Sequence, residues 1–121
     1  GFLVRRRHDD AICGVINLSA ITYDALCSAW ISYFGVAGMD ERGYMKEGMT
    51  LVSAYAFGEL GLHRLEANIQ PDNRASIQLV QRLGFRREGL SRRYLKIGGR
   101  WRDHERWAML AEDLRGGPRA T

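Results

Sequence analysis

The hydrophobic pattern of the chain changes period at Tyr44, and this change constrains the fold most. Three apolar, strand-like segments precede it, at residues 1–7, 11–21 and 27–36. From Tyr44 to Leu60, apolar residues recur at steps of four and three, which is the pattern of one helix face. These residues are Met45, Met49, Val52 and Ala56. The sequence therefore predicts strands first and a helix after them.

The second half of the chain alternates between the two patterns. Residues 63–69 read as a short strand, and residues 74–83 read as a helix with Asp72 or Asn73 as its N-cap. Residues 85–110 read as a hairpin that turns at Gly98 and Gly99. The expected order is β-β-β-α-β-α-β-β. Such an order predicts an α+β fold, in which helices pack on a mixed sheet.

Length and composition place the chain among ordinary globular domains. Its 121 residues fit one domain, which we expect to span residues 1–114, followed by a flexible tail at 115–121. No apolar run approaches the roughly 18 residues that cross a bilayer, and no signal-peptide pattern occurs, so a cytoplasmic protein is expected. The two cysteines predict free thiols, and no metal site is expected. Because the chain starts at Gly1 with a strand-like run, we expect an N-terminal portion to be missing.

The chain is mildly basic, with a net charge of +4 and a pI of about 9.4. This charge suits an anionic cofactor, or an acidic or nucleic-acid-bound partner, and does not choose between them. No RNA-binding motif with aromatic stacking positions is evident, so no direct contact with nucleic acid is expected.

Two helix starts are candidate anion sites. Arg42 and Gly43 precede the first helix, whose free N–H groups and partial positive charge favour phosphate. Asn73 and Ser76 lie at the start of the second helix. Taken alone, the first start is better explained as an ordinary strand-to-helix turn, and the second is equally well explained as a helix cap. If the two preceding strands are neighbours, however, both helix starts lie at one crevice, which is a better site than either alone.

Three segments together resemble the GNAT superfamily of acetyl-CoA-dependent N-acetyltransferases. They are "RGYMKEGMTLVSAYAF", "GLHRLEANIQPDNRASIQLVQRLGFRREG" and "YLKIGGRWRDHERWAML". Within the superfamily they are most similar to the RimJ/RimL type, which acetylates the N-termini of ribosomal proteins. The resemblance extends from Cys27 to Met109. It implies a GNAT-like, mostly antiparallel sheet, and it implies acetyl-CoA as the cofactor.

The resemblance also implies which residues hold acetyl-CoA. The family binds the pyrophosphate on the first helix start, and Asp40 departs from the Gln or Arg usual in that motif. The pantetheine arm lies between two strands that splay apart, here residues 30–36 and 64–69. The residues implied to bind the cofactor are Tyr33, Phe34, Val36, Arg42, Gly43, Tyr44, Met45 and Asn73.

Catalytic roles follow from the same resemblance. Ser76 matches the side chain that protonates the leaving thiolate in RimL-like enzymes. Related enzymes place a glutamate base where this chain has Asn68, and Glu66 is then the best carboxylate candidate; an ion pair with an arginine is the equally weighted alternative. His63 and His104 are further potential bases. For His63 a structural role is favoured, and for His104 a packing or acceptor-groove role is weighed equally with catalysis, with Asp103 as its orienting partner.

The implied acceptor is a primary amine. An α-amine has a pKa near 7.7–8.0, about two and a half units below that of lysine, so a site without a strong base suits a protein N-terminus better. A ribosomal-protein N-terminus is the expected partner, and a second copy of the chain is another candidate. The alternatives are a small-molecule acceptor such as an aminoglycoside or polyamine, a truncated member that binds without catalysing, and a basic RNA-binding module.

Overall fold

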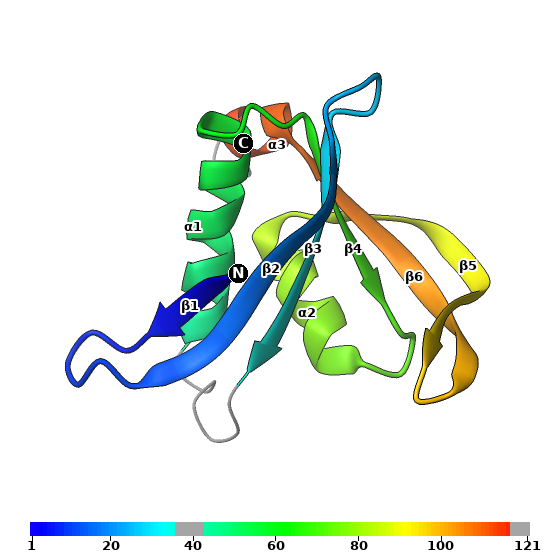
Figure 1. Ribbon diagram of the computed structural model, residues 1–121, viewed down its shortest axis with the longest axis horizontal. Coiled ribbons are helices and arrows are strands. Elements are labelled where there is room, and N and C mark those ends of the chain that lie inside the picture. The colour runs from blue at the N-terminus through cyan, green and yellow to red at the C-terminus, as the bar shows by residue number, and fades with distance from the viewer. Residues whose placement is uncertain (36–42, 117–121) are drawn as a thin grey trace.

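The computed structural model describes residues 1–35 and 43–116 (Figure 1). Val36, Asp40 and Arg42, which the sequence resemblance addresses, lie outside the described residues. The strands are β1 (Phe2–Arg5), β2 (Ile12–Thr22), β3 (Ser28–Gly35), β4 (Arg64–Ile69), β5 (Arg86–Ile97) and β6 (Arg100–Leu110). The helices are α1 (Tyr44–Gly58), α2 (Arg74–Leu83) and α3 (Ala111–Gly116). None of the described helices is long and apolar enough to cross a membrane.

All six strands form one mixed sheet in the order β1-β2-β3-β4-β6-β5. Every neighbouring pair is antiparallel except β3 and β4, which are parallel because α1 crosses over between them. The expected α+β class and element order are therefore confirmed. The third strand is central, as its apolar character on both faces predicts.

Helix α1 packs on the sheet through the predicted apolar stripe. Met45, Met49, Val52 and Ala56 are all buried. Gly48 lies on the same helix, and a Cβ there would come within 2.8 Å of Val4 Cγ2 and 3.1 Å of Ile16 Cδ1, so the glycine lets α1 approach β1 and β2 closely. The helix ends at Gly58, two residues earlier than the periodicity predicts.

Helix α2 packs on the same face of the sheet as α1. Val80 is fully buried in the core shared with Met49 and Leu65, and Ile77 and Leu83 pack against that core. Asn73 is the N-cap, with its side chain accepting a hydrogen bond from the Ser76 N–H, and Gly84 ends the helix in the left-handed conformation. The predicted cap and stop are therefore confirmed.

Two tight turns also agree with the sequence. Gly98 and Gly99 both have positive φ angles, of 60° and 80°, in the turn between β5 and β6. Asp9 and Asp10 lie in the turn between β1 and β2. The short helix α3 was not predicted from the sequence; it follows β6 directly, and Asp113 Oδ2 accepts a hydrogen bond from the Leu110 N–H at 2.9 Å.

Candidate active site

The two central strands separate partway along their length. β3 and β4 pair at Ser28–Arg64, Ala29–Leu65 and Trp30–Glu66, and the register stops there. Beyond these pairs, β3 continues to Gly35 and β4 continues to Ile69 (Figure 1). Beyond this point, backbone N–H and C=O groups of each strand face the gap and form no hydrogen bonds to the other strand. The sheet therefore has two facing strand edges in its interior.

A cleft of about 240 Å³ occupies this opening. It is lined by Ile31, Ser32, Tyr33, Met49, Ala67, Asn68, Ile69, Gln70, Asn73, Ser76, Val80, Leu95, Ile97 and His104. We call it the β3/β4 cleft. Four of the residues assigned from sequence line it together, although they come from three different elements: Tyr33, Asn68, Asn73 and Ser76.

The β3/β4 cleft reaches both faces of the sheet. Side chains alternate along a strand, and on β4 Leu65, Ala67 and Ile69 are buried against the helices. Glu66 and Asn68 therefore point to the opposite face, which we call the open face because no described helix packs on it. Since Asn68 and Ala67 both line the cleft, two ligands can approach the same gap from opposite sides.

A hydrogen bond spans the helix-covered side of the cleft. The Tyr33 hydroxyl donates to Ser76 Oγ at 2.6 Å. Burial raises the pKa of the Tyr33 phenol, and the hydrogen bond to Ser76 opposes that effect only in part. Tyr33 therefore stays protonated and acts as a donor at neutral pH. Ser76 accepts through Oγ and keeps its own hydroxyl proton to donate elsewhere.

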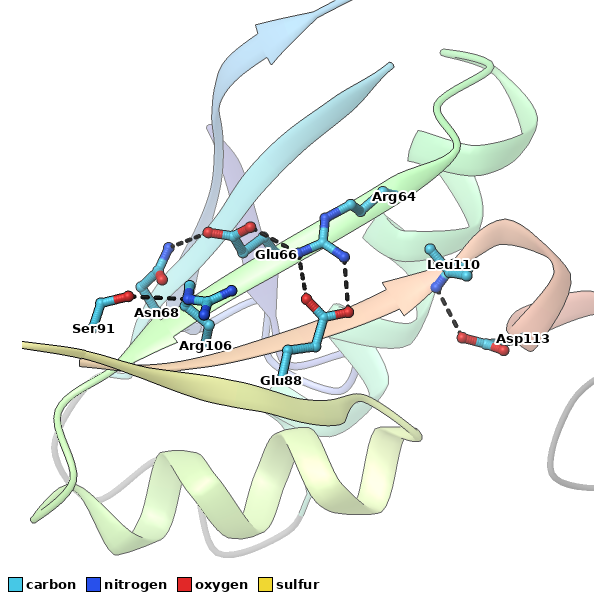
Figure 2. A network of polar contacts seen from close by, with 8 residues as sticks. All are labelled: Arg64, Glu66, Asn68, Glu88, Ser91, Arg106, Leu110 and Asp113. Atoms are coloured by element: carbon cyan, nitrogen blue, oxygen red, sulfur yellow. Dashed lines mark hydrogen bonds and ion pairs between the residues drawn. The ribbon is translucent and has the colours of Figure 1, made fainter. Parts of the chain in front are cut away.

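A polar network occupies the open face beside the cleft (Figure 2). Arg64 donates to both oxygens of Glu88, at 2.9 and 2.7 Å, and also to Glu66 Oε1 at 2.9 Å. The other Glu66 oxygen accepts from Asn68 Nδ2 at 3.1 Å. The hydrogen bonds from Arg64 lower the pKa of Glu88, and those same contacts raise the pKa of Arg64.

Glu66 thus forms the ion pair that was the alternative interpretation of its sequence position. Its two carboxylate oxygens are both engaged, one by Arg64 and one by Asn68, and its side chain is only 15% exposed. It is not among the residues that line the cleft, whereas Asn68 is. The role of Glu66 as a base stays a prediction that the geometry does not favour.

His104 lies inside the cleft on β6. It is 3% exposed, its Nδ1 is 3.0 Å from the Arg102 carbonyl oxygen, and its ring meets Tyr94 edge-on at 6.3 Å. Asp103, the orienting partner considered from the sequence, instead accepts a hydrogen bond from the Arg93 N–H. His63, by contrast, has a 54% exposed side chain near Glu112, outside the lining of the cleft.

At the start of α1, the described residues offer no side-chain hydrogen bond to the first N–H groups of the helix. Gly43 is the N-cap with φ of 74°, which favours glycine, and no side chain of residues 1–35 or 43–116 caps the helix there. Its carbonyl accepts from the Glu47 N–H, Tyr44 is half-buried, and Met45 is buried. Phe34 on β3 is 67% exposed. No group of three or more potential metal-ligating side chains occurs in the described part of the chain.

Comparison with known proteins shows which family has this sequence and architecture. The model of the acetyltransferase (GNAT) domain family matches residues 1–86. A probable N-acetyltransferase, YjcK of Bacillus subtilis, is 41% identical over 105 residues, which are 87% of this chain and 58% of that protein. The ribosomal protein uS5-alanine N-acetyltransferase of Escherichia coli is 34% identical over 102 residues, covering 84% of this chain and 53% of that protein.

Solved structures agree with this placement. RimJ from Mycobacterium smegmatis, in complex with CoA-disulfide, superposes with a TM-score of 0.83 at 36% identity, covering 88% of this chain and 51% of that one. A spermidine N-acetyltransferase SpeG from Vibrio cholerae reaches a TM-score of 0.85 at 22% identity, covering 99% and 69%, which shows a shared fold.

The chain belongs to the GNAT acetyltransferase family, and it is related to the RimJ type. It spans little more than half the length of the curated relatives it matches.

Proposed function

We propose that the chain transfers an acetyl group from acetyl-CoA to a primary amine, and that the amine is the N-terminus of a protein. The observation that supports this most is the separation of β3 from β4 after Trp30, with a cleft in the gap. An extended ligand can pair with the free edge of a strand. The pantetheine arm has amide groups and a narrow chain that suit such an edge. The residues present therefore fit acetyl-CoA.

Different residues are proposed to bind the pyrophosphate and the pantetheine of acetyl-CoA. The first-turn amides of α1, from Gly43 to Met45, would hold the pyrophosphate, because a helix start with free N–H groups favours phosphate. Asn73 and the β3 edge at Tyr33 and Phe34 would hold the pantetheine. Val36 and Arg42 are proposed for the same binding site from the sequence resemblance.

Acetyl-CoA, when bound, supplies an acetyl thioester. Backbone N–H groups of β3 beyond Trp30 that point away from β2 can stabilise negative charge that develops on an acyl oxygen in the gap. Ser76 accepts from Tyr33 and has a hydroxyl proton free, so it can protonate the leaving sulfur. The cleft opens to the open face at Asn68, where an amine can enter.

The N-terminal acceptor is supported by relatives and by chemistry. The Escherichia coli relative acts on the alanine of ribosomal protein uS5, as its name states. No carboxylate lines the described cleft. Such a site suits an α-amine, which is partly neutral at pH 7, better than a lysine. A ribosomal-protein N-terminus is accordingly the proposed partner.

Two measurements test the proposal. Acetyl-CoA at about 100 times its Kd should stabilise the chain by ~2.7 kcal/mol in thermal melting, and Gly43→Asp should reduce that shift because it places a negative charge at the helix start. Thiol release should then occur with an alanine-terminated peptide and stop when that peptide is N-acetylated. A polyamine is the competing acceptor; faster release with it would transfer the assignment to small amines. No melting shift at all would refute the cofactor site.

A further inference from the structure

Among the described residues that line the β3/β4 cleft, two have titratable side chains, Tyr33 and His104. Tyr33 is a hydrogen-bond donor to Ser76, so it is not available as a base near neutral pH. Glu66 is outside the lining and is held by Arg64. If an amine loses a proton within the described cleft, His104 is the lining side chain that can take it.

The tautomer of His104 is set by the backbone. A carbonyl oxygen can only accept a hydrogen bond, so the 3.0 Å contact with the Arg102 oxygen requires the proton on Nδ1. The lone pair of the neutral ring is then on Nε2. Nε2 has no hydrogen-bond partner among the described residues. A nearly buried imidazole with a fixed tautomer and a free acceptor nitrogen has the form of a general base.

Asn68 supplies a second unpaired acceptor beside it. Its Nδ2 donates to Glu66, which fixes the amide, and its Oδ1 is buried with no hydrogen-bond partner in the described part of the chain. Buried acceptors without a partner are uncommon and call for one. On the antiparallel ladder Asn68 pairs with Arg106, so Asn68 and His104 are diagonal neighbours on the open face. Both residues line the same cleft, from adjacent strands.

We infer that His104 and Asn68 form the acceptor-amine site at the open-face side of the β3/β4 cleft, with His104 as the catalytic base. A primary amine has two N–H groups and thus matches two acceptors. Asn68 Oδ1 orients the amine, and His104 Nε2 takes its proton as the N–C bond forms. The C–S bond breaks and the sulfur receives the Ser76 proton. The imidazolium then releases its proton to water and Ser76 takes one from water, which restores both residues.

In this arrangement Glu66 is a positioning residue. Arg64 holds its carboxylate, and the carboxylate in turn holds the Asn68 amide so that Oδ1 remains the free atom (Figure 2). A glutamine at position 66 has a single oxygen for two donors, Arg64 and Asn68 Nδ2, so it keeps only part of this positioning. If His104 is the base, Glu66→Gln should cause only a small loss of activity. If Glu66 is the base, the same substitution should cause a large one. The inference rests on the acetyl transfer proposed above.

The test compares His104→Ala, Glu66→Gln and a control, His63→Gln, in thiol-release assays with acetyl-CoA and the alanine-terminated peptide. We expect His104→Ala to lower kcat/KM for the peptide by about 10²- to 10⁴-fold. Free imidazole should restore part of that rate, and should not restore the rate of Ser76→Ala. Glu66→Gln should lower kcat/KM by about fivefold, because the positioning of Asn68 is kept only in part. The control His63→Gln should stay within about twofold of the wild type. The acetyl-CoA melting shift of His104→Ala should match that of the wild type, which separates lost chemistry from lost folding; His104→Gln serves if the alanine variant does not fold.

A loss of less than about threefold in His104→Ala, or a loss near 100-fold in Glu66→Gln, would overturn the inference while leaving acetyl transfer intact. A wild-type chain that releases no thiol with any amine would overturn acetyl transfer, and the inference with it. Recovery of Ser76→Ala by imidazole to the same extent would show that the rescue bypasses the site, and would also count against His104.

Discussion

The Tyr33 hydroxyl donates a 2.6 Å hydrogen bond to Ser76 Oγ, and so joins β3 to the first turn of α2 across the cleft. The two residues are 43 positions apart in the chain. The bond uses a lone pair of Ser76 and leaves its proton free. Tyr33 therefore sets the direction in which Ser76 can donate.

Tyr33→Phe should lower kcat for acetyl transfer by roughly five- to tenfold, because it removes one hydrogen bond of ~1 kcal/mol and keeps the ring. The KM for acetyl-CoA should change less than twofold. Thiol-release assays in which acetyl-CoA is varied at a saturating peptide concentration give both constants. Tyr33→Phe should cost nothing further in a Ser76→Ala background, since both changes act through one hydroxyl. Independent, multiplying losses would contradict this coupling.

Asn73 is expected to have two separable roles. Asn73→Ala removes the cap on the Ser76 N–H and should lower the free energy of unfolding by about 1 kcal/mol. Asn73→Ser keeps a capping oxygen and should stay within about 0.5 kcal/mol of the wild type. Both variants should show a smaller melting shift with acetyl-CoA, because both lose the amide. Wild-type affinity in Asn73→Ser would mean that only the cap matters. Urea unfolding with and without acetyl-CoA measures both effects.

Gly14 and Gly35 lie opposite each other on β2 and β3 and form a matched pair. A Cβ on Gly14 would lie 2.6 Å from the Phe34 carbonyl oxygen and would also meet Met45, whereas a Cβ on Gly35 would meet no atom of the described residues within 4 Å. Gly14→Ala should lower the free energy of unfolding by about 1–3 kcal/mol, as overpacking does. Gly35→Ala should change it by less than about 1 kcal/mol in urea titrations. Equal effects would show that the backbone at Gly14 moves freely.

Asp9 should contribute a pH-dependent part of the stability. A hydrogen bond from Arg6, at 2.9 Å from Nε to Oδ1, lowers the pKa of Asp9 from 3.8 to about 2, with help from the Ala11 N–H. Because the folded pKa is below the unfolded one, the contribution is complete above about pH 4 and is lost as the pH falls through about 2.

Asp9→Asn should therefore lower Tm at pH 7 and have no effect on it below pH 2. Arg6→Gln is the matched control: it should reproduce the pH 7 loss, and the double variant should lose no more than either single one. A Tm difference that is the same at both pH values would rule out the ionised pair as its source.

The local elements could be predicted because each has a local cause. The α1 stripe from Met45 to Ala56 follows helical spacing, and all its members are buried. The α2 boundaries follow from Asn73 and Gly84, whose cap chemistry is explicit in the sequence. α3 was missed because six residues are too few to show a period. Trp101, which shares strand parity with buried Trp107, is 59% exposed, since the end of a hairpin can extend past the core.

The site could be predicted only in part. That β3 and β4 separate was expected from family resemblance. The point of separation, after Trp30, was not predicted, because no local pattern marks where pairing stops. The contact between Tyr33 and Ser76 depends on the tertiary fold. The environment of His104 depends on the Arg102 carbonyl and the Tyr94 ring, and Asp103, its neighbour in sequence, is engaged by Arg93. Sequence neighbours suggested the wrong orienting group for this reason.

The short register between β3 and β4 also has a mechanical consequence. Three residue pairs connect the half-sheet β1-β2-β3 to the half-sheet β4-β6-β5. The core that α1 and α2 share with both halves therefore supplies contacts between them that a continuous ladder would otherwise provide. An extended molecule that hydrogen-bonds to both strands in the gap would hold the two half-sheets in a fixed relative position. The strand edges in the gap are backed by α1 and α2 through Met49 and Val80, so they are shielded from the edge-to-edge aggregation to which an outer strand is prone.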